Sequence, residues 1–270
     1  MAVVGVRLAR PVAIASRRSF RVLEHDLLVF RRGWSSYVLS GLTQPFLYLV
    51  AMGIGLGLYV NRNGSLPGGV PYLDYIAPAL LVTQAMMAAA FESAWPIMGK
   101  IAWDKTYHAA LNTPVGALDL LAGDLMWIAL QATLLSALFL AVIVVLGAAA
   151  SPLVVFAVPL AVLTAIAFAA PIMAFTATQT GDGAFNALFR FGITPLFLFS
   201  GTFFPIEKLP VLMQPLAWIT PLYHGVAAAR SLALGQVDPV GLTVHVAALL
   251  AVTAAGVAAG RVTFRRRLVV

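Results

Sequence analysis

Side chains able to do acid–base, nucleophilic or metal chemistry are few and scattered in this sequence. It has no cysteine, and its four histidines, His25, His108, His224 and His245, fall in four separate segments. Neither a His-Glu-x-x-His nor a Gly-x-Ser-x-Gly motif occurs, and no group of histidines and carboxylates has metal-ligand spacing. We therefore predict that the chain is not an enzyme and has no catalytic residue, metal site or cofactor of its own.

Two ionisable residues, Glu92 and Arg190, lie inside strongly apolar stretches. A charged side chain at membrane depth is costly unless it pairs, faces water or reaches the interface. We expect both at a similar depth, so one interpretation is a buried ion pair that holds two helices together. The other is a direct role of Glu92 in transport. Gln131 and His245, also in apolar stretches, are expected to bond to neighbouring helices.

The elements that must position these residues are membrane-spanning helices. Of the 270 residues, 61% are hydrophobic and only 10% are charged, whereas an average soluble domain has about 25% charged residues. A hydrocarbon core about 30 Å thick needs roughly 20 apolar residues in a helix. We therefore predict an all-α polytopic membrane protein with six spans. The predicted spans are about 35–59, 75–98, 119–147, 153–177, 184–204 and 240–260.

The basic residues predict the orientation of the chain. With the N-terminus inside, fourteen of the 17 lysines and arginines fall in inner segments, and only Arg62, Lys208 and Arg230 fall in outer ones. This bias predicts that both termini are cytoplasmic and that the net charge of +7 serves membrane orientation, not nucleic-acid binding. The first 34 residues lack the pattern of a signal peptide. Arginine-, alanine- and valine-rich usage suggests a high-GC bacterium, so we expect the chain in a bacterial cytoplasmic membrane.

Three regions follow from these boundaries: a cytoplasmic segment at 1–34, a transmembrane domain at 35–262 and a basic tail at 263–270. Phe20, Leu23, Leu27 and Phe30 recur at helical spacing and predict an amphipathic helix in the membrane interface. The basic residues of this interface helix are Arg17, Arg18, Arg21, Arg31 and Arg32. The helix either only anchors the topology or also contacts a cytoplasmic partner.

The inner loop at 99–118, "GKIAWDKTYHAALNTPVGAL", starts with charged residues, continues with helix formers and is stopped by Pro114. It is either a plain connection or a short rigid helix that fits a groove on a cytoplasmic protein and transmits motion.

The outer segment at 205–235 is apolar, but prolines interrupt it too often for a continuous span. Irregular backbone at membrane depth is tolerated only where protein or a water-filled cavity covers it. We expect short helices that dip back toward the membrane. They form either a lid over a transport path or an outer loop packed down for stability alone.

Three stretches together resemble the permeases of ABC type-2 exporters, in particular the nodulation-signal (lipo-oligosaccharide) and drug exporter branch. "FESAWPIMGK" (91–100) and "DKTYHAALNTPVGALDLLAGDLMW" (104–127) are similar to the second span and inner loop of that family. "FLFSGTFFPIEKLPVLMQPLAWITPLYHGVAAAR" (197–230) resembles its signature. The resemblance covers most of the chain, and the last stretch is its most specific part.

The resemblance implies a half-transporter that pairs with a second permease subunit and sits on two copies of a separate ATPase, which binds ATP and Mg. The absence of Gly-x-x-x-x-Gly-Lys-Ser/Thr from this chain agrees with that division. The inner loop would be the coupling helix, beside the interface helix, and export would move an amphiphile outward. The implied coupling residues are Lys100, Asp104, Lys105, Thr106, Tyr107, His108 and Pro114.

In the resembled family the outer segment caps the transport path. The implied gate residues are Phe203, Phe204, Pro205, Trp218, Pro221, Tyr223 and His224. A drug-like lipophile, a glycolipid and a lipo-oligosaccharide all stay open as substrates, and the largely aliphatic spans favour a smaller lipophile. Two other functions stay open: an ion-coupled secondary transporter and a non-transporting membrane assembly factor.

Overall fold

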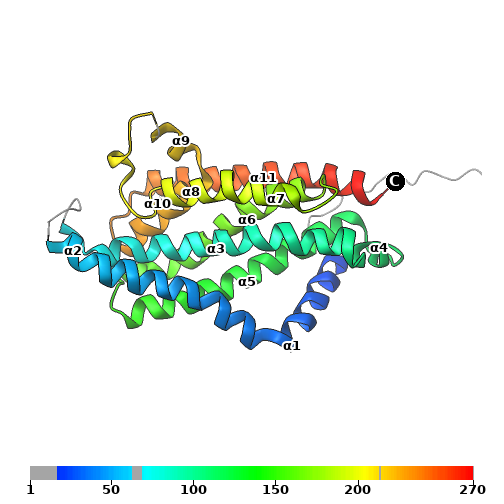
Figure 1. Cartoon of the computed structure of the whole chain (residues 1–270), viewed down its shortest axis with the longest axis horizontal. Coiled ribbons are helices and arrows are strands. Elements are labelled where there is room, and N and C mark those ends of the chain that lie inside the picture. Colours follow the sequence, from blue (N-terminus) through cyan, green and yellow to red (C-terminus); the bar gives the residue numbers. More distant parts are fainter. Residues whose placement is uncertain (1–16, 63–68, 213, 270) are drawn as a thin grey trace, which may run out of the picture.

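The computed structural model describes residues 17–62, 69–212 and 214–269 (Figure 1). These residues form helices joined by turns, and no strand occurs among them. The predicted all-α class is therefore confirmed. Arg7 and Arg10, which contribute to the predicted inner charge, lie outside the described residues.

Five helices in the described part are long and apolar enough to cross a membrane, so the chain is a multi-pass membrane protein. The first is α1 (Arg17–Tyr48), continued by a π-helical stretch η1 (Leu49–Leu56) and α2 (Gly57–Arg62). The others are α3 (Tyr72–Met98) with η3 (Gly99–Trp103), α5 (Ala117–Val145), η4 (Pro152–Phe156) with α6 (Ala157–Thr176), and α11 (Pro239–Leu268). Most of the predicted tail at 263–270 is the last part of α11.

The fifth predicted span, at 184–204, is shorter and less regular than expected. It consists of α7 (Gly183–Ala187), the π-helical stretch η5 (Leu188–Ile193) and α8 (Thr194–Phe199). At about 1.5 Å per residue, its 17 residues reach about 26 Å, less than a core of about 30 Å. It ends at a turn around Gly201, whose φ of +79° suits glycine. Six spans therefore stay a prediction.

Helix α1 has two arms that meet at Gly33, where the backbone leaves helical geometry (φ −130°, ψ 20°). Figure 1 shows the two arms diverging from this corner, with the first arm reaching toward α4 (Thr106–Leu111) and the second leading to α2. The first arm corresponds to the predicted interface helix and the second to the first predicted span.

The centre of the bundle is α6, which packs against α3, α5 and α11. Small residues allow these close contacts. A Cβ atom on Gly256 of α11 would lie 2.5 Å from Cδ of Pro171 in α6, and one on Gly123 of α5 would lie 2.5 Å from Cβ of Val22 in α1. Neither position has room for a side chain, so both contacts depend on glycine.

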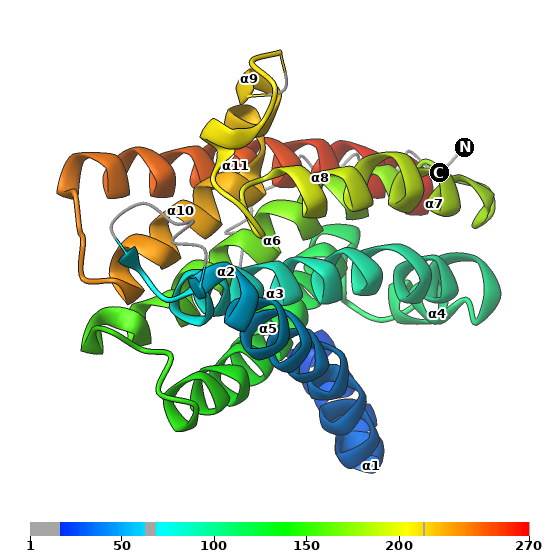
Figure 2. The ribbon, with the colours of Figure 1, turned by 60° about the vertical axis from the view of Figure 1, so that its left-hand side comes forward.

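The bundle has two distinct ends (Figure 1). At one, called the loop end, α4 lies near the C-terminal end of α11. At the other, called the opposite end, lie α2 and the chain between α8 and α11. That chain contains the 3₁₀ turn η6 (Ile206–Lys208), α9 (Gln214–Ile219) and α10 (Pro221–Ala233). Helix α10 packs against α3, α6 and α11, whereas Figure 2 shows α9 standing off the bundle.

Candidate functional site

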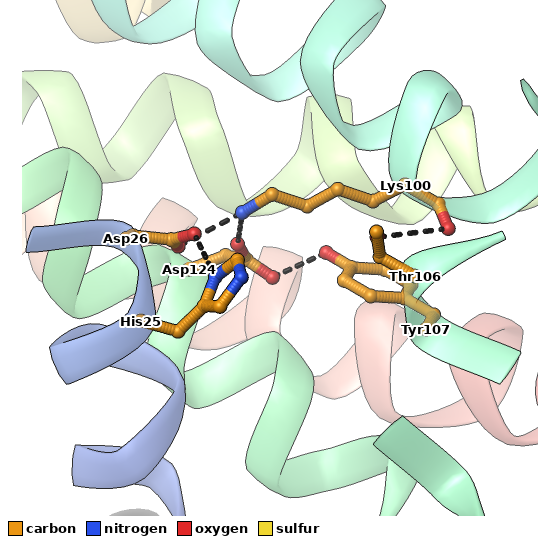
Figure 3. A network of polar contacts seen from close by, with 6 residues as sticks. All are labelled: His25, Asp26, Lys100, Thr106, Tyr107 and Asp124. Carbon is orange, nitrogen blue, oxygen red and sulfur yellow. Dashed lines mark hydrogen bonds and ion pairs between the residues drawn. The ribbon is translucent and has the colours of Figure 1, made fainter. Parts of the chain in front are cut away.

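Four residues form a buried ionic cluster at the loop end: Asp26, Lys100, Tyr107 and Asp124 (Figure 3). The Lys100 ammonium donates to Oδ2 of Asp26 at 2.8 Å and to Oδ1 of Asp124 at 2.5 Å. The Tyr107 hydroxyl donates to the other oxygen of Asp124. The cluster thereby joins the first arm of α1, the end of α3, the loop helix α4 and the start of α5.

The stability of this cluster depends on all of its charged residues being present. The Asp26 and Asp124 side chains are 7% and 1% exposed and share one ammonium. Breaking a buried ion pair by removing one partner is strongly destabilising because it leaves an uncompensated charge. Burial, followed by the charge of Asp124, raises the pKa of Tyr107 well above its ordinary value. Tyr107 therefore keeps its proton and stays a hydrogen-bond donor.

A second set of contacts attaches the first arm of α1 to the far side of the same loop. Arg18 donates to the carbonyl of Pro114 at 2.8 Å, and the Ser19 hydroxyl lies 3.3 Å from Oδ1 of Asp119. Asp119 also accepts from the backbone N–H of Gly116 at 2.9 Å, which caps the start of α5. The interface arm is thus connected to both ends of the loop that carries α4.

The structure sorts the implied coupling residues into two groups. Tyr107 is only 2% exposed and Lys100 points into the ionic cluster, so these two hold the loop from inside. The outward-facing members are Asp104, Lys105, Thr106, His108 and Pro114, all of which are exposed. Contact of these residues with an ATPase stays a prediction.

The interface arm presents its arginines outward. Arg17, Arg18, Arg21, Arg31 and Arg32 are all exposed, and Arg21 forms a surface ion pair with Glu24 at 2.7 Å. Phe20 and Leu27 are 54% and 40% exposed, whereas Ser19 and Asp26 are buried against the bundle. The outer part of the apolar stripe therefore faces away from the protein. The contact with the bundle is made by the polar residues Ser19 and Asp26 together with Val22 and Phe30, which pack against α5.

Glu92 and Arg190 do not form the ion pair that we considered. The ion pairs of the described residues include none between them. Glu92 instead faces the α1 and α5 side, where Tyr37, Lys100 and Gln131 line the same cavity. Arg190 lies on η5 and is exposed. Their similar depth stays a prediction, and it does not bring the two side chains together.

At the opposite end, Arg230 of α10 holds the turn that follows α8. Its guanidinium donates to the carbonyls of Gly201 at 2.9 Å and Thr202 at 3.3 Å, and to the carbonyl of Tyr75 at 3.1 Å. It also lies 3.6 Å from the centroid of the Tyr75 ring, a cation–π contact. We call residues 200–204 the pinned turn.

Three further hydrogen bonds attach the pinned turn to its surroundings. Tyr72 donates to the carbonyl of Phe203 at 3.2 Å, and Thr202 bonds to Thr83 at 3.3 Å. Ser200 bonds to Thr220 at 2.9 Å, which links the turn to the start of α10. The turn is therefore attached to both α3 and α10.

The implied gate residues lie around this turn but do not form one cluster. Phe203 meets Phe197 of α8 edge to face, with 5.0 Å between ring centroids. Phe204 and Tyr223 instead pack on a small separate core of Ile206, Leu209 and Ala217.

The remaining gate residues have other environments. Pro205 precedes η6, and Pro221 begins α10, which the Thr220 hydroxyl caps. Trp218 is 46% exposed on α9. His224 lies beside His245 of α11, with 2.9 Å between their Nδ1 atoms, so the expectation that His245 bonds to a neighbouring helix holds. Burial and His245 lower the pKa of His224.

Sequence reasoning missed Asp26, Asp124 and the role of Arg230. Asp124 had a signal, because a carboxylate eight residues into an apolar helix requires a partner. Arg230 was counted only as an outer charge, although it follows a mostly apolar stretch that needs a polar anchor. Asp26 looked like an ordinary charge on the polar face of an amphipathic helix, and nothing in its spacing pointed to Lys100.

Comparison with known proteins agrees with this arrangement. The family model described as "ABC-2 type transporter" matches residues 19–234, a range that includes the ionic cluster and the pinned turn. Nodulation protein J of Rhizobium leguminosarum bv. trifolii is 32% identical over 228 residues, which cover 84% of this chain and 85% of the relative. Nodulation protein J of Rhizobium meliloti (strain 1021) is 30% identical over 247 residues, 92% of each chain. With its long apolar helices, this chain belongs to the ABC-2 type transporter family and is a membrane permease subunit of an ABC exporter.

Proposed function

We propose that the chain exports an amphiphilic substrate across a bacterial cytoplasmic membrane, as one of two permease subunits on two copies of a separate ATPase. ATP and Mg would bind to those partners. In this proposal both termini and the loop end are cytoplasmic, as the distribution of basic residues favours. The opposite end, with the pinned turn, then faces outward.

The observation that carries the proposal is the attachment of α4 to the interface arm through the ionic cluster. The loop helix is short, and its inner side is occupied by Tyr107 and Lys100. Thr106 and His108 are exposed on its outer side, and Asp104 and Lys105 are exposed just before it. A partner that pushes on these exposed residues would move α1, α3 and α5 together, because the cluster joins all three.

The structure gives less direct support for the identity of the substrate. The relatives are named for nodulation, which keeps a lipo-oligosaccharide among the candidates beside a glycolipid and a drug-like lipophile. The pinned turn supports an outward release step, since it lies where α8 ends and α10 returns to the bundle. Phe203 and Phe204 would seal the path there.

Two other functions predict different behaviour. An ion-coupled secondary transporter needs no ATPase partner, and an assembly factor needs no transported substrate. Co-purification with a stoichiometric ATPase supports the exporter, and transport that persists without any ATPase would contradict it.

The exposed side of α4 supplies the direct test. Asp104, Lys105, Thr106 and His108 are changed together to alanine, and ATPase activity and export are measured for the complete complex. We expect export to fall by tenfold or more at normal amounts of protein, because the docking surface is lost, while ATP hydrolysis no longer responds to substrate. A matched control replaces Asn112 and Thr113, exposed residues at the end of the same loop, and should retain coupling. Normal coupling in the fourfold variant would contradict the proposal.

The gate is tested at Phe203. In Phe203→Ala we expect a folded protein that leaks small solutes or exports altered substrates, because the contact with Phe197 is lost. Trp218→Ala is the comparison, because the Trp218 ring is exposed on α9 and lies outside the pinned turn. Unchanged export and unchanged permeability in Phe203→Ala would leave the segment with a purely stabilising role.

A further inference from the structure

Two adjoining cavities lie between α1, α3 and α5. The larger has a volume of about 480 Å³ and the smaller about 260 Å³. Tyr37 and Glu92 line both, so these two residues form the boundary at which the cavities meet. Lys100 of the inner loop also lines the smaller cavity, whereas the residues of the pinned turn line neither cavity.

Carboxyl groups outnumber cationic groups in the lining of the smaller cavity. Three carboxyl groups line it, those of Asp26, Glu92 and Asp124, and one ammonium, that of Lys100. With all four ionised, the formal charge is three negative plus one positive, or −2. Lys100 is already bonded to Asp26 and Asp124, and Glu92 forms no ion pair with any described residue. A carboxyl group at this depth is a candidate for binding an opposite charge.

Aromatic rings form the other wall of the smaller cavity. Phe30 lies between Tyr37 and Trp127, with centroid distances of 5.4 Å and 5.5 Å and edge-to-face angles of 79° and 65°. Several rings at different orientations beside a carboxylate are the arrangement that recognises organic ammonium groups. The three carboxyl groups do not form a metal site, because no three or more His, Cys, Asp or Glu side chains among the described residues are placed to hold one metal ion together.

The larger cavity is mostly apolar but contains one polar group without a bond. Leu81, Phe91, Leu135 and Phe139 contribute to its lining. The Ser136 hydroxyl also lines it, is buried and has no hydrogen-bond partner among the described residues. The residue is 3% exposed. A buried hydroxyl left unpaired costs roughly 1–3 kcal/mol, so a ligand group that bonds to it would remove that penalty.

We infer that the joined cavities bind a cationic amphiphile. Its ammonium group lies between Glu92 and the rings of Phe30, Tyr37 and Trp127, and its apolar chain fills the larger cavity. An amide, ester or hydroxyl in that chain bonds to Ser136. As a statement about exported cargo this inference rests on the proposed function, whereas binding itself can be measured independently. The same chemistry is available in a resident lipid with a quaternary ammonium headgroup.

Binding is measured with the full chain in phosphatidylglycerol nanodiscs, using radiolabelled dodecyltrimethylammonium and subtracting its partition into empty nanodiscs. We expect saturable binding of the radiolabelled probe. Unlabelled dodecyltrimethylammonium should displace it, and a neutral dodecyl polyethylene glycol ether should not. Glu92→Gln and Trp127→Leu should each weaken binding by about tenfold, in keeping with the loss of a desolvated cation contact. Asp182→Asn, an exposed carboxylate in the turn before α7, is the matched control and should bind normally.

Ser136 is tested with a second probe that carries an amide in its chain. Ser136→Ala should weaken this amide-containing ammonium by about threefold to tenfold, in line with one hydrogen bond, and leave dodecyltrimethylammonium unchanged. Equal binding of the cationic and neutral probes, or normal affinity of the cation in a folded Glu92→Gln protein, would overturn the inference.

Two further measurements separate the sources of the ligand and the two proposals. If the probe binds more weakly when the chain is in phosphatidylcholine nanodiscs, the lipid headgroup competes for the site, and the ligand is a resident lipid. If the probe stimulates ATP hydrolysis by the complete complex, the ligand is cargo. The fourfold α4 variant should keep its binding. Loss of probe binding with intact coupling overturns only the cavity inference. Intact probe binding by a chain that co-purifies with no ATPase overturns only the exporter proposal.

Discussion

The two ends of the bundle are held together by different kinds of polar contact. At the loop end, side chains from separate helices meet one another, as Lys100 meets Asp26 and Asp124. At the opposite end, one side chain, that of Arg230, meets backbone carbonyls of Tyr75, Gly201 and Thr202. Contacts between side chains depend on the charge of both partners, whereas contacts to carbonyls depend on the shape of the donor.

This difference suits the two roles that we propose. A cluster of side chains can transmit a push on α4 to three helices while its members stay paired. The bonds that Arg230 and Tyr72 donate to carbonyls of the turn do not involve the side chains of Phe203 and Phe204, so these two residues can vary without loss of those bonds. The comparison makes three predictions, which run from the largest expected effect to the smallest.

Lys100→Met should be the most damaging change, because it leaves the buried carboxylate of Asp124 without a cation and that of Asp26 with only the His25 ring, whose Nδ1 lies 3.2 Å away. We expect a loss of about 3–5 kcal/mol, as for a broken buried ion pair. Thermal unfolding in detergent, followed by size-exclusion chromatography, measures this loss.

The triple variant Lys100→Met, Asp26→Asn, Asp124→Asn removes all the charges of the ionic cluster and is the matched control. It should recover much of the lost stability. A triple variant that is no more stable than Lys100→Met alone would show that charge pairing is not what holds the loop end.

Arg230→Lys should lower stability by about 1.5–3 kcal/mol, the range for a hydrogen bond to a charged group. Lysine keeps the charge but lacks the planar fork that reaches carbonyls on two sides. Limited proteolysis between residues 200 and 220 should become faster. If Arg230→Lys is as stable and as resistant to proteolysis as the original chain, then the charge at this position matters and the geometry of the donor does not. The contrast between the two ends would then disappear.

The smallest expected effects on stability are those of alanine at two tightly packed glycines, Gly225 and Gly123, which form a closely matched pair of substitutions. A Cβ atom at Gly225 of α10 would lie 2.9 Å from Cγ1 of Val82 and closer still to Thr164, so it is confined by both α3 and α6. Gly123 meets only the first arm of α1. We expect Gly225→Ala to cost more than Gly123→Ala, both within about 1–3 kcal/mol for overpacking, because the α1 arm can move outward. Thermal unfolding of both variants tests the order, and the reverse order would indicate that the α1 arm is the more rigid contact.

The long helices could be predicted well from the sequence, and the fifth element and the site could not. Stretches such as 119–147 and 153–177 are apolar enough that only a helix satisfies their backbone in lipid. The stretch 184–204 is equally apolar, but its helix ends at Phe199, because the backbone turns at Gly201 and Arg230 takes the free carbonyls. That ending depends on a residue about thirty positions away.

The site residues show the same division. The short inner loop could be predicted because charge, length and a terminating proline are local properties, whereas its coupling residues were implied by the family resemblance. Tyr107 was expected beside them and is instead buried, since its hydroxyl bonds to Asp124 seventeen residues later. Of the two interpretations considered for Glu92, the ion pair with Arg190 does not occur among the described residues, because similar depth in two helices does not place two side chains on facing surfaces.

By itself, then, the sequence determined the environment, the helical class and the family resemblance, through properties that add up along the chain: hydropathy, charge distribution and the signature around 197–230. Only the tertiary structure decided which charges meet, which face of the interface arm is buried and where the turn after α8 is held. The physical reason is that a buried ion or hydroxyl is stabilised by whatever lies within about 3 Å of it. Helix rotation and packing set that distance, and sequence separation does not.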